Sequence, residues 1–130
     1  IGLLTSSLLF ALLHLGNPDI GILSILNIAL FGLFASLYLL RTDNVWGIIG
    51  LHTAWNFSQG NIYGFSVSGT DVDVAVLNFI PKSEWSWLTG GAFGAEASVF
   101  SSLILLLAVL YLLFKMKKDG SLTGLVGKTE

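Results

Sequence analysis

The sequence predicts an all-α protein, a polytopic bundle of transmembrane helices with about four spans. Hydrophobic residues make up 54% of its 130 residues and charged residues only 11%, whereas globular domains carry about 25% charged residues. The mean hydropathy is +0.81, and long stretches contain no Asp, Glu, Lys or Arg. A helix needs roughly 20 apolar residues to cross a bilayer. Several of these stretches therefore have the length and composition of membrane spans.

Composition also excludes several classes of protein. The net charge of -2 provides no basic surface for the phosphates of nucleic acid. The chain has no cysteine, which rules out a disulfide framework and a Cys-ligated zinc site. The high apolar content is the opposite of what keeps a chain disordered. A lipid bilayer is therefore the expected surrounding, and nucleic acid is not an expected partner.

Four uncharged runs are the expected spans. The first two, residues 1–15 and 20–40, are separated by Gly, Asn, Pro and Asp at 16–19, which end a helix and begin a turn. The third is expected at about 45–65, preceded by Asp and Asn residues suited to cap a helix. The fourth is expected at about 95–114, and lysines follow it.

The connecting segments predict how the chain lies in the membrane. The long polar stretch 66–94 contains Trp85 and Trp87, and paired tryptophans favour the membrane interface; a short packed lid is the alternative. Lysines after the last span place the C-terminus in the cytoplasm by the positive-inside rule. We therefore divide the chain into a membrane domain, 1–114, and a basic, polar cytoplasmic tail, 115–130.

Two histidines and one asparagine are the candidate site residues. His14 follows Phe10 by four positions on the first span, and Asn56 follows His52 by four positions on the third. Residues four apart share a helix face, and polar groups at membrane depth are functional candidates by default. Ideal straight spans would hold the two histidines at different depths. The alternative is a packing role without chemistry, in which each histidine hydrogen-bonds to the backbone of a neighbouring helix or to Ser6, Ser7 or Thr53.

These side chains favour hydrolytic chemistry but lack a base. Neutral imidazole can hold a water or ligate a metal, and an Asn amide can donate N–H groups to an oxyanion. Peptide hydrolysis also needs a group that activates water, and no acidic residue lies within a predicted span. The acidic residues are expected in turns (Asp19, Asp43), in the polar stretch (Asp71, Asp73, Glu84), at the start of the last helix as its cap (Glu96) and in the tail (Asp119, Glu130).

Both motifs resemble those of a known family. The pentapeptides FALLH at 10–14 and HTAWN at 52–56 are similar to the F-x-x-x-H and H-x-x-x-N motifs of the CAAX protease and bacteriocin-processing family, the CPBP or Abi intramembrane proteases. Flanking residues and the glycine-rich stretch 89–96 also resemble bacterial members. The family's E-E-x-x-x-R motif is absent from this sequence. Because Ile1 begins inside an apolar run, we expect a C-terminal fragment that is inactive alone.

The resemblance implies an intramembrane endopeptidase with His14, His52 and Asn56 as catalytic residues. Its substrate would be a peptide or a prenylated protein, and its location the bacterial cell membrane. The family is described both as metalloproteases and as glutamate-dependent enzymes. Zinc held by His14 and His52 is therefore a candidate cofactor, although a third, carboxylate ligand is lacking.

Two other functions remain open at this stage. A non-catalytic member could serve bacteriocin self-immunity or act as a membrane scaffold, and it would tolerate loss of both histidines. A transporter could use His14 and His52 to line an ion path, which predicts flux without peptide cleavage. The sequence does not indicate an oligomeric state.

Overall fold

The computed structural model describes residues 2–124, and the regular secondary structure of this part of the chain is helical. An isolated bridge between Val67 and Thr70 is the one β-type pairing found there, so the all-α prediction is confirmed for these residues. The predicted tail extends to residue 130, and its last six positions lie outside the described residues. The α-helices are α1 (Gly2–Leu13), α2 (Ile22–Thr42), α3 (Val45–Phe57), α4 (Ser86–Thr89) and α5 (Val99–Lys118).

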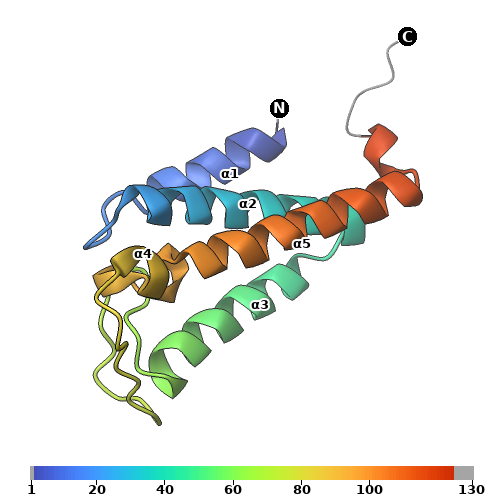
Figure 1. The fold of residues 1–130 in the computed structure, drawn as a ribbon. Coiled ribbons are helices and arrows are strands. Elements are labelled where there is room, and N and C mark those ends of the chain that lie inside the picture. Colours follow the sequence, from blue (N-terminus) through green and yellow to red (C-terminus); the bar gives the residue numbers. More distant parts are fainter. Residues whose placement is uncertain (1, 125–130) are drawn as a thin grey trace.

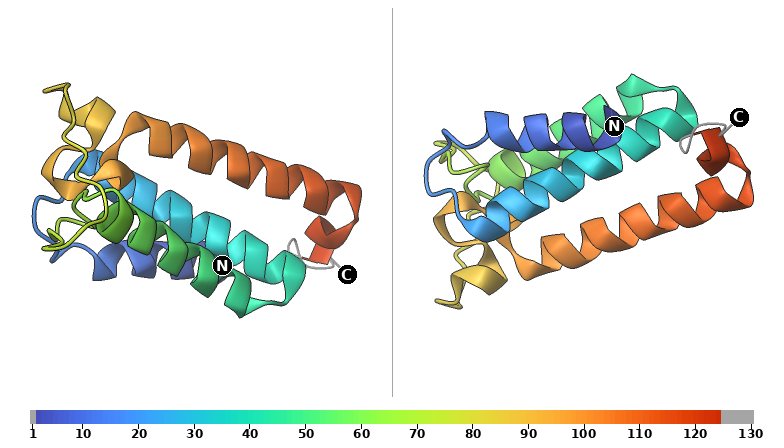
Figure 2. Two further views of the ribbon diagram at one scale, coloured as in Figure 1. Left: turned by 90° about the horizontal axis from the view of Figure 1, so that it is seen from below. Right: turned by 90° about the horizontal axis from the view of Figure 1, so that it is seen from above.

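The helix α2 is the centre of the bundle. It packs along both α1 and α5, whereas it meets α3 over a shorter stretch. In Figure 1, α3 diverges from the other long helices toward the end where the loops and α4 gather. Figure 2 shows from two further sides that α1 and α5 flank α2. The loops and α4 gather at one end of the bundle.

Two of the described helices, α2 and α5, are long and apolar enough to cross a membrane. Only 28% and 22% of their most apolar windows are buried, so these helices expose apolar surface instead of forming a soluble core. The helix α1 is apolar but short. The expected third span, 45–65, contains a 13-residue α-helix that ends at Phe57 and continues as a π-helix, Ser58–Ile62. The prediction of about four spans is thus not confirmed; two are supported.

Helix ends follow local capping chemistry. Asn44 caps α3 as expected, because its Oδ1 accepts a hydrogen bond from the Trp46 N–H at 3.0 Å. Asp43 instead ends α2 in a left-handed conformation, with φ 51°. The start of α5 differs from the prediction: Ser98 is the N-cap, and its Oγ accepts from the Ser101 N–H. Glu96 lies two residues earlier, in a 3-10 turn, and it does not cap α5.

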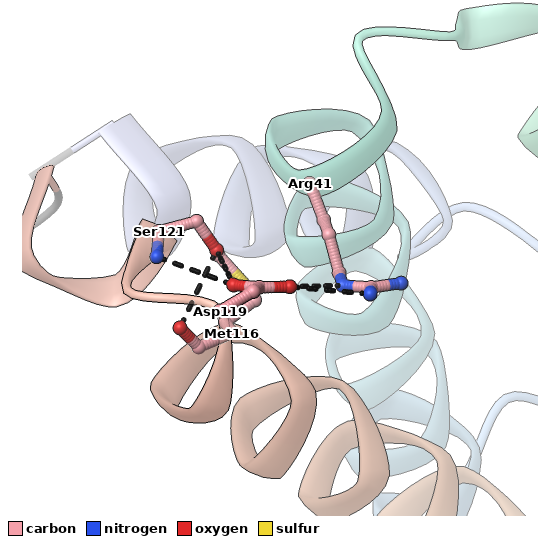
Figure 3. A network of polar contacts seen from close by, with 4 residues as sticks. All are labelled: Arg41, Met116, Asp119 and Ser121. Atoms are coloured by element: carbon pink, nitrogen blue, oxygen red, sulfur yellow. Dashed lines mark hydrogen bonds and ion pairs between the residues drawn. The ribbon is translucent and has the colours of Figure 1, made fainter.

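An ion pair joins the ends of α2 and α5 that lie away from the loops. Figure 3 shows Arg41 reaching Asp119, whose Oδ2 accepts from the guanidinium at 3.2 Å. Asp119 also accepts from the hydroxyl and backbone N–H of Ser121. These hydrogen bonds, together with Arg41, lower the pKa of Asp119. Since α5 carries three lysines in its last turn, the basic residues of both long helices gather at one end of the bundle.

Candidate active site

A cavity of about 480 Å³ lies between α1, α2, α3 and α5. Both predicted histidines, His14 and His52, line this cavity. The structure therefore brings together two side chains that are 38 positions apart in the sequence, one in the turn that follows α1 and one in α3. The remaining lining residues are Phe10, Asn27, Ile28, Phe31, Phe34, Leu51, Ala54, Trp55, Ser58, Ser68, Glu96, Ser101, Ile104, Leu105 and Ala108.

The cavity has a polar end and an apolar end. Near the loops it is lined by side chains at the start of α2 and α5, such as Asn27 and Ser101, and by Ser68 and Glu96 from the loops themselves. One or two turns further along the same helices the lining is Phe34, Leu105 and Ala108. An amphiphilic molecule with a polar head and an apolar tail matches this gradient.

The imidazole of His14 has a defined tautomer. Its Nδ1 lies 2.7 Å from the carbonyl oxygen of Phe10, four residues earlier. A carbonyl oxygen only accepts, so Nδ1 carries the proton and donates. In the neutral ring, Nε2 then keeps a lone pair that can accept a hydrogen bond from water. One nitrogen of His14 is thus engaged by a backbone carbonyl of the preceding helix α1, and the other is available.

Aromatic rings connect the two histidines. The ring of Phe10 lies 4.6 Å from that of His14 and 5.9 Å from that of His52, measured between centroids. Phe31 of α2 lies 5.0 Å from His52. Within the described chain, no side chain or backbone group hydrogen-bonds to the His52 ring. His52 is therefore held by ring packing, and its nitrogens are free to bind a ligand or water.

The two histidines line one cavity although His52 lies in the middle of α3. With about 1.5 Å rise per residue, the 13 residues of α3 extend roughly 20 Å, and His52 lies about 10 Å from the start of the helix. His14 follows the last turn of α1. Straight spans were expected to hold the two histidines at different depths, whereas both side chains line the same cavity. The helix α3 is shorter than the expected span and diverges from the other long helices in Figure 1.

Asn56 lies one turn beyond His52 on α3 but does not line the cavity. Its Oδ1 is buried and has no hydrogen-bond partner among the described residues. Buried carboxamide oxygens are normally paired, so this acceptor marks a position for a water or for a donor from another molecule. The next turn is the π-helix, where Gln59 donates to the Ser66 carbonyl at 2.6 Å. Such π-bulges are frequent at functional sites.

Sequence reasoning missed two residues of this region, Glu96 and Asn27. Glu96 is half-buried and lines the cavity, and its carboxylate interacts electrostatically with His52. Asn27 is only 3% exposed and donates to the carbonyls of Glu96 and Ser98 at 2.7 and 3.0 Å. A polar residue in an apolar span is itself a signal, and it could have identified Asn27. The position of Glu96 depends on a loop whose path the sequence does not specify.

The donor set does not fit a zinc ion by itself. The described residues contain no group of three His, Cys, Asp or Glu side chains arranged to hold a metal. His14 and His52 supply at most two ligands, whereas zinc in proteins takes three or four protein ligands. These two histidines alone therefore do not make a zinc site in the described chain.

Comparisons with known proteins agree with the motif resemblance. Residues 1–58 match the family described as "Rce1-like: Type II CAAX prenyl endopeptidase Rce1-like". The matched segment contains both pentapeptides and hence Phe10, His14, His52 and Asn56. No curated protein and no solved structure matches the chain. The predicted resemblance is thus confirmed: residues 1–58 are similar to the Rce1-like type II CAAX prenyl endopeptidases.

Proposed function

We propose that this chain is the C-terminal part of an intramembrane endopeptidase of the CAAX prenyl protease and bacteriocin-processing type. One observation carries the proposal: His14, in the turn that follows α1, and His52 of α3 line a single cavity among apolar helices. The family match over residues 1–58 supports the protease class. We further propose a bacterial cell membrane as the location, with the lysine-bearing end of α5 in the cytoplasm.

The proposed reaction is hydrolysis of a peptide bond by water. The water oxygen bonds to the carbonyl carbon, the C–N bond breaks, and a proton passes to the leaving amine. His14 binds the attacking water through Nε2, since its Nδ1 is engaged by Phe10. His52 of α3 stabilises the same water or the leaving group. Asn56, one turn beyond His52 and outside the cavity lining, turns its amide toward the bound peptide and donates to the developing oxyanion.

In this proposal the carboxylate that activates the water comes from a part of the full protein that precedes Ile1. The resemblance implies such a group in the E-E-x-x-x-R motif, which residues 1–130 do not contain. The chain of 130 residues alone is therefore expected to be inactive.

The polarity of the cavity supports a peptide or prenylated protein as the substrate. An apolar tail would lie against Phe34, Leu105 and Ala108, and the peptide bond would lie at the end occupied by both histidines. About 25 cal/mol is gained for each Å² of apolar surface removed from water, so an attached prenyl group would add binding free energy without taking part in the reaction.

The test is peptide cleavage by the full-length protein in lipid nanodiscs. Quenched fluorescent peptides with and without a farnesyl group are the substrates, and His52→Ala and Asn56→Ala are the variants. Both are expected to lose turnover by about 100-fold or more, the scale of removing one oxyanion donor. Thr53→Ala and Asn61→Ala are matched controls, because both residues are exposed and neither lines the cavity.

Other outcomes would assign a different function. Unchanged turnover in His52→Ala or Asn56→Ala would refute the catalytic assignment. Absence of cleavage by the full-length protein, together with protection of cells against a bacteriocin, would indicate the non-catalytic immunity role instead. Ion flux without cleavage would indicate the transporter.

A further inference from the structure

Glu96 is the one ionisable residue of the cavity lining to which the proposed reaction gives no role. The other ionisable side chains of the lining are His14 and His52, and no Lys or Arg lines it. A half-buried carboxylate in mostly apolar surroundings is unfavourable unless polar groups compensate its charge. His52 lines the same cavity, and the Glu96 carboxylate acts on it electrostatically.

The backbone around Glu96 is held in place from several sides. Asn27 of α2 donates to the Glu96 carbonyl at 2.7 Å, and Ser101 of α5 donates to the Ala95 carbonyl at 2.7 Å. The preceding Gly94 has φ +106°, and a Cβ there would collide with the Ser66 carbonyl oxygen. Only glycine fits this conformation and this close approach. The 3-10 turn that carries Glu96 is consequently fixed to both long helices.

The carboxylate itself is also oriented. The Ser68 hydroxyl donates to Glu96 Oε2 at 2.6 Å. Ser68 has a left-handed backbone, φ 50°, which is unfavourable for a residue with a side chain. Its carbonyl accepts from the Asn17 side chain at 3.1 Å. The loop thus maintains a strained residue in the place where it can hold one oxygen of Glu96.

Two residues that line the same cavity, Glu96 and His52, then have hydrogen-bonding groups that are not used. Among the described residues nothing donates to Glu96 Oε1, and nothing bonds to the ring of His52. Imidazoles in reaction sites are commonly oriented by a carboxylate, which selects the nitrogen that carries the proton. The Ser68 bond leaves Oε1 available for this purpose.

We propose that Glu96 is a positioning residue for His52. Its Oε1 accepts a hydrogen bond from one His52 ring nitrogen, directly or through one water, and so fixes the tautomer and orientation of that ring. The other nitrogen then faces the space where substrate and water bind. The effect of Glu96 on catalysis depends on the proposed protease function, whereas its effect on the ring does not.

The test combines spectroscopy with kinetics on the full-length protein in nanodiscs. With ring-labelled histidine, 15N shifts report which nitrogen of His52 is protonated, and His52→Ala identifies its signals. Glu96→Gln can still accept from Ser68 but has lost the charge. We expect one His52 tautomer in the wild type and a mixture in Glu96→Gln, with kcat lowered by about 10- to 100-fold, the usual effect of losing such an orienting partner.

Controls separate positioning from folding. In Glu96→Gln, KM is expected to stay within about twofold, and Glu96→Asp, which keeps the charge, should restore part of kcat. Glu84→Gln changes an exposed carboxylate of the polar loop and should alter neither measurement. If Glu96→Gln does not fold, the spectrum of Glu96→Asp is the test of the pairing. The shorter side chain should weaken the hydrogen bond to His52 and shift the His52 signals in the same direction.

Identical His52 spectra in the wild type and in the folded Glu96 variant would overturn this inference, whatever the activity. If the wild-type protein cleaves no peptide but Glu96→Gln still changes the His52 spectrum as expected, the proposed function is refuted and the pairing of Glu96 with His52 stands. Equal losses of kcat in Glu96→Gln and Glu96→Asp would also contradict a role that depends on the carboxylate.

Discussion

Replacing Asn27 should destabilise the bundle and disturb the site at the same time. Asn27 is buried in α2 and makes three side-chain hydrogen bonds: two donated to the carbonyls of Glu96 and Ser98, and one accepted from the Ser102 hydroxyl at 2.7 Å. It thereby links α2 to the loop that carries Glu96 and to the first turn of α5. Asn27→Leu keeps a similar volume and removes all three bonds.

The expected loss follows from the number of bonds. Side-chain hydrogen bonds between membrane helices contribute about 0.6 kcal/mol on average and about 1.7 at most. Three of them give a decrease of about 2 to 5 kcal/mol in the free energy of unfolding. Ser102→Ala removes only one bond, and its expected decrease is about 0.6 to 1.7 kcal/mol.

Equilibrium unfolding of the full-length protein in mixed micelles, followed by circular dichroism, measures these differences. Asn78→Ala is the matched control, because Asn78 is exposed and makes no side-chain hydrogen bond in the described structure. A decrease below about 0.5 kcal/mol for Asn27→Leu, or a larger effect for Ser102→Ala than for Asn27→Leu, would refute the role of Asn27 as the link.

Three further predictions follow from the fold. Gly32→Ala should lower the melting temperature, since its Cβ would lie 2.9 Å from the Ser7 Cα and push α1 from α2. Gly50→Ala is the control and should not lower the melting temperature, because a Cβ at Gly50 would have open space around it. The pKa of Asp119 is lowered in the folded chain, mainly by the Ser121 hydroxyl, so its contribution to stability is present above the unfolded pKa of about 3.9 and is lost as pH falls through the folded pKa. Asp119→Asn should flatten the melting temperature against pH in that acid range; an unchanged slope would contradict the assignment. Trp85 and Trp87 are stacked and exposed, so in a Trp46→Phe, Trp55→Phe background shallow brominated lipids should quench fluorescence more than deep ones. Stronger quenching by the deep label would place the loop elsewhere.

Much of the fold could be predicted because apolar runs and breakers are local properties of the sequence. The turn at 16–19 and the Asn44 cap follow from the chemistry of a few neighbouring residues. The length of α3 could not be read this way. Its apolar run continues past Phe57, but the backbone changes to a π-helix there, and Gln59 bonds to Ser66. Neither the change to a π-helix nor this contact follows from the apolar pattern of the run.

The candidate site was predictable in part for the same reason. His14 and His52 could be singled out because polar residues are rare in apolar runs. Glu96 could not be predicted as part of the site, because the loop that carries it to the cavity is held by Asn27, Ser68 and the conformation of Gly94. Asn27 and Ser68 are both far from Glu96 in the sequence, so their contacts with it cannot be inferred from a helix face. The conformation of Gly94 is local, but it also depends on the close approach of Ser66.

The most direct test of the central claim is a double-mutant cycle on the two histidines. Peptide turnover by the full-length protein would be measured for His14→Ala, His52→Ala and the combined variant. Residues that act as one unit show non-additive losses, so a single cavity predicts that the combined variant is little slower than either single variant. Losses that multiply, or a single variant with wild-type turnover, would contradict a shared site.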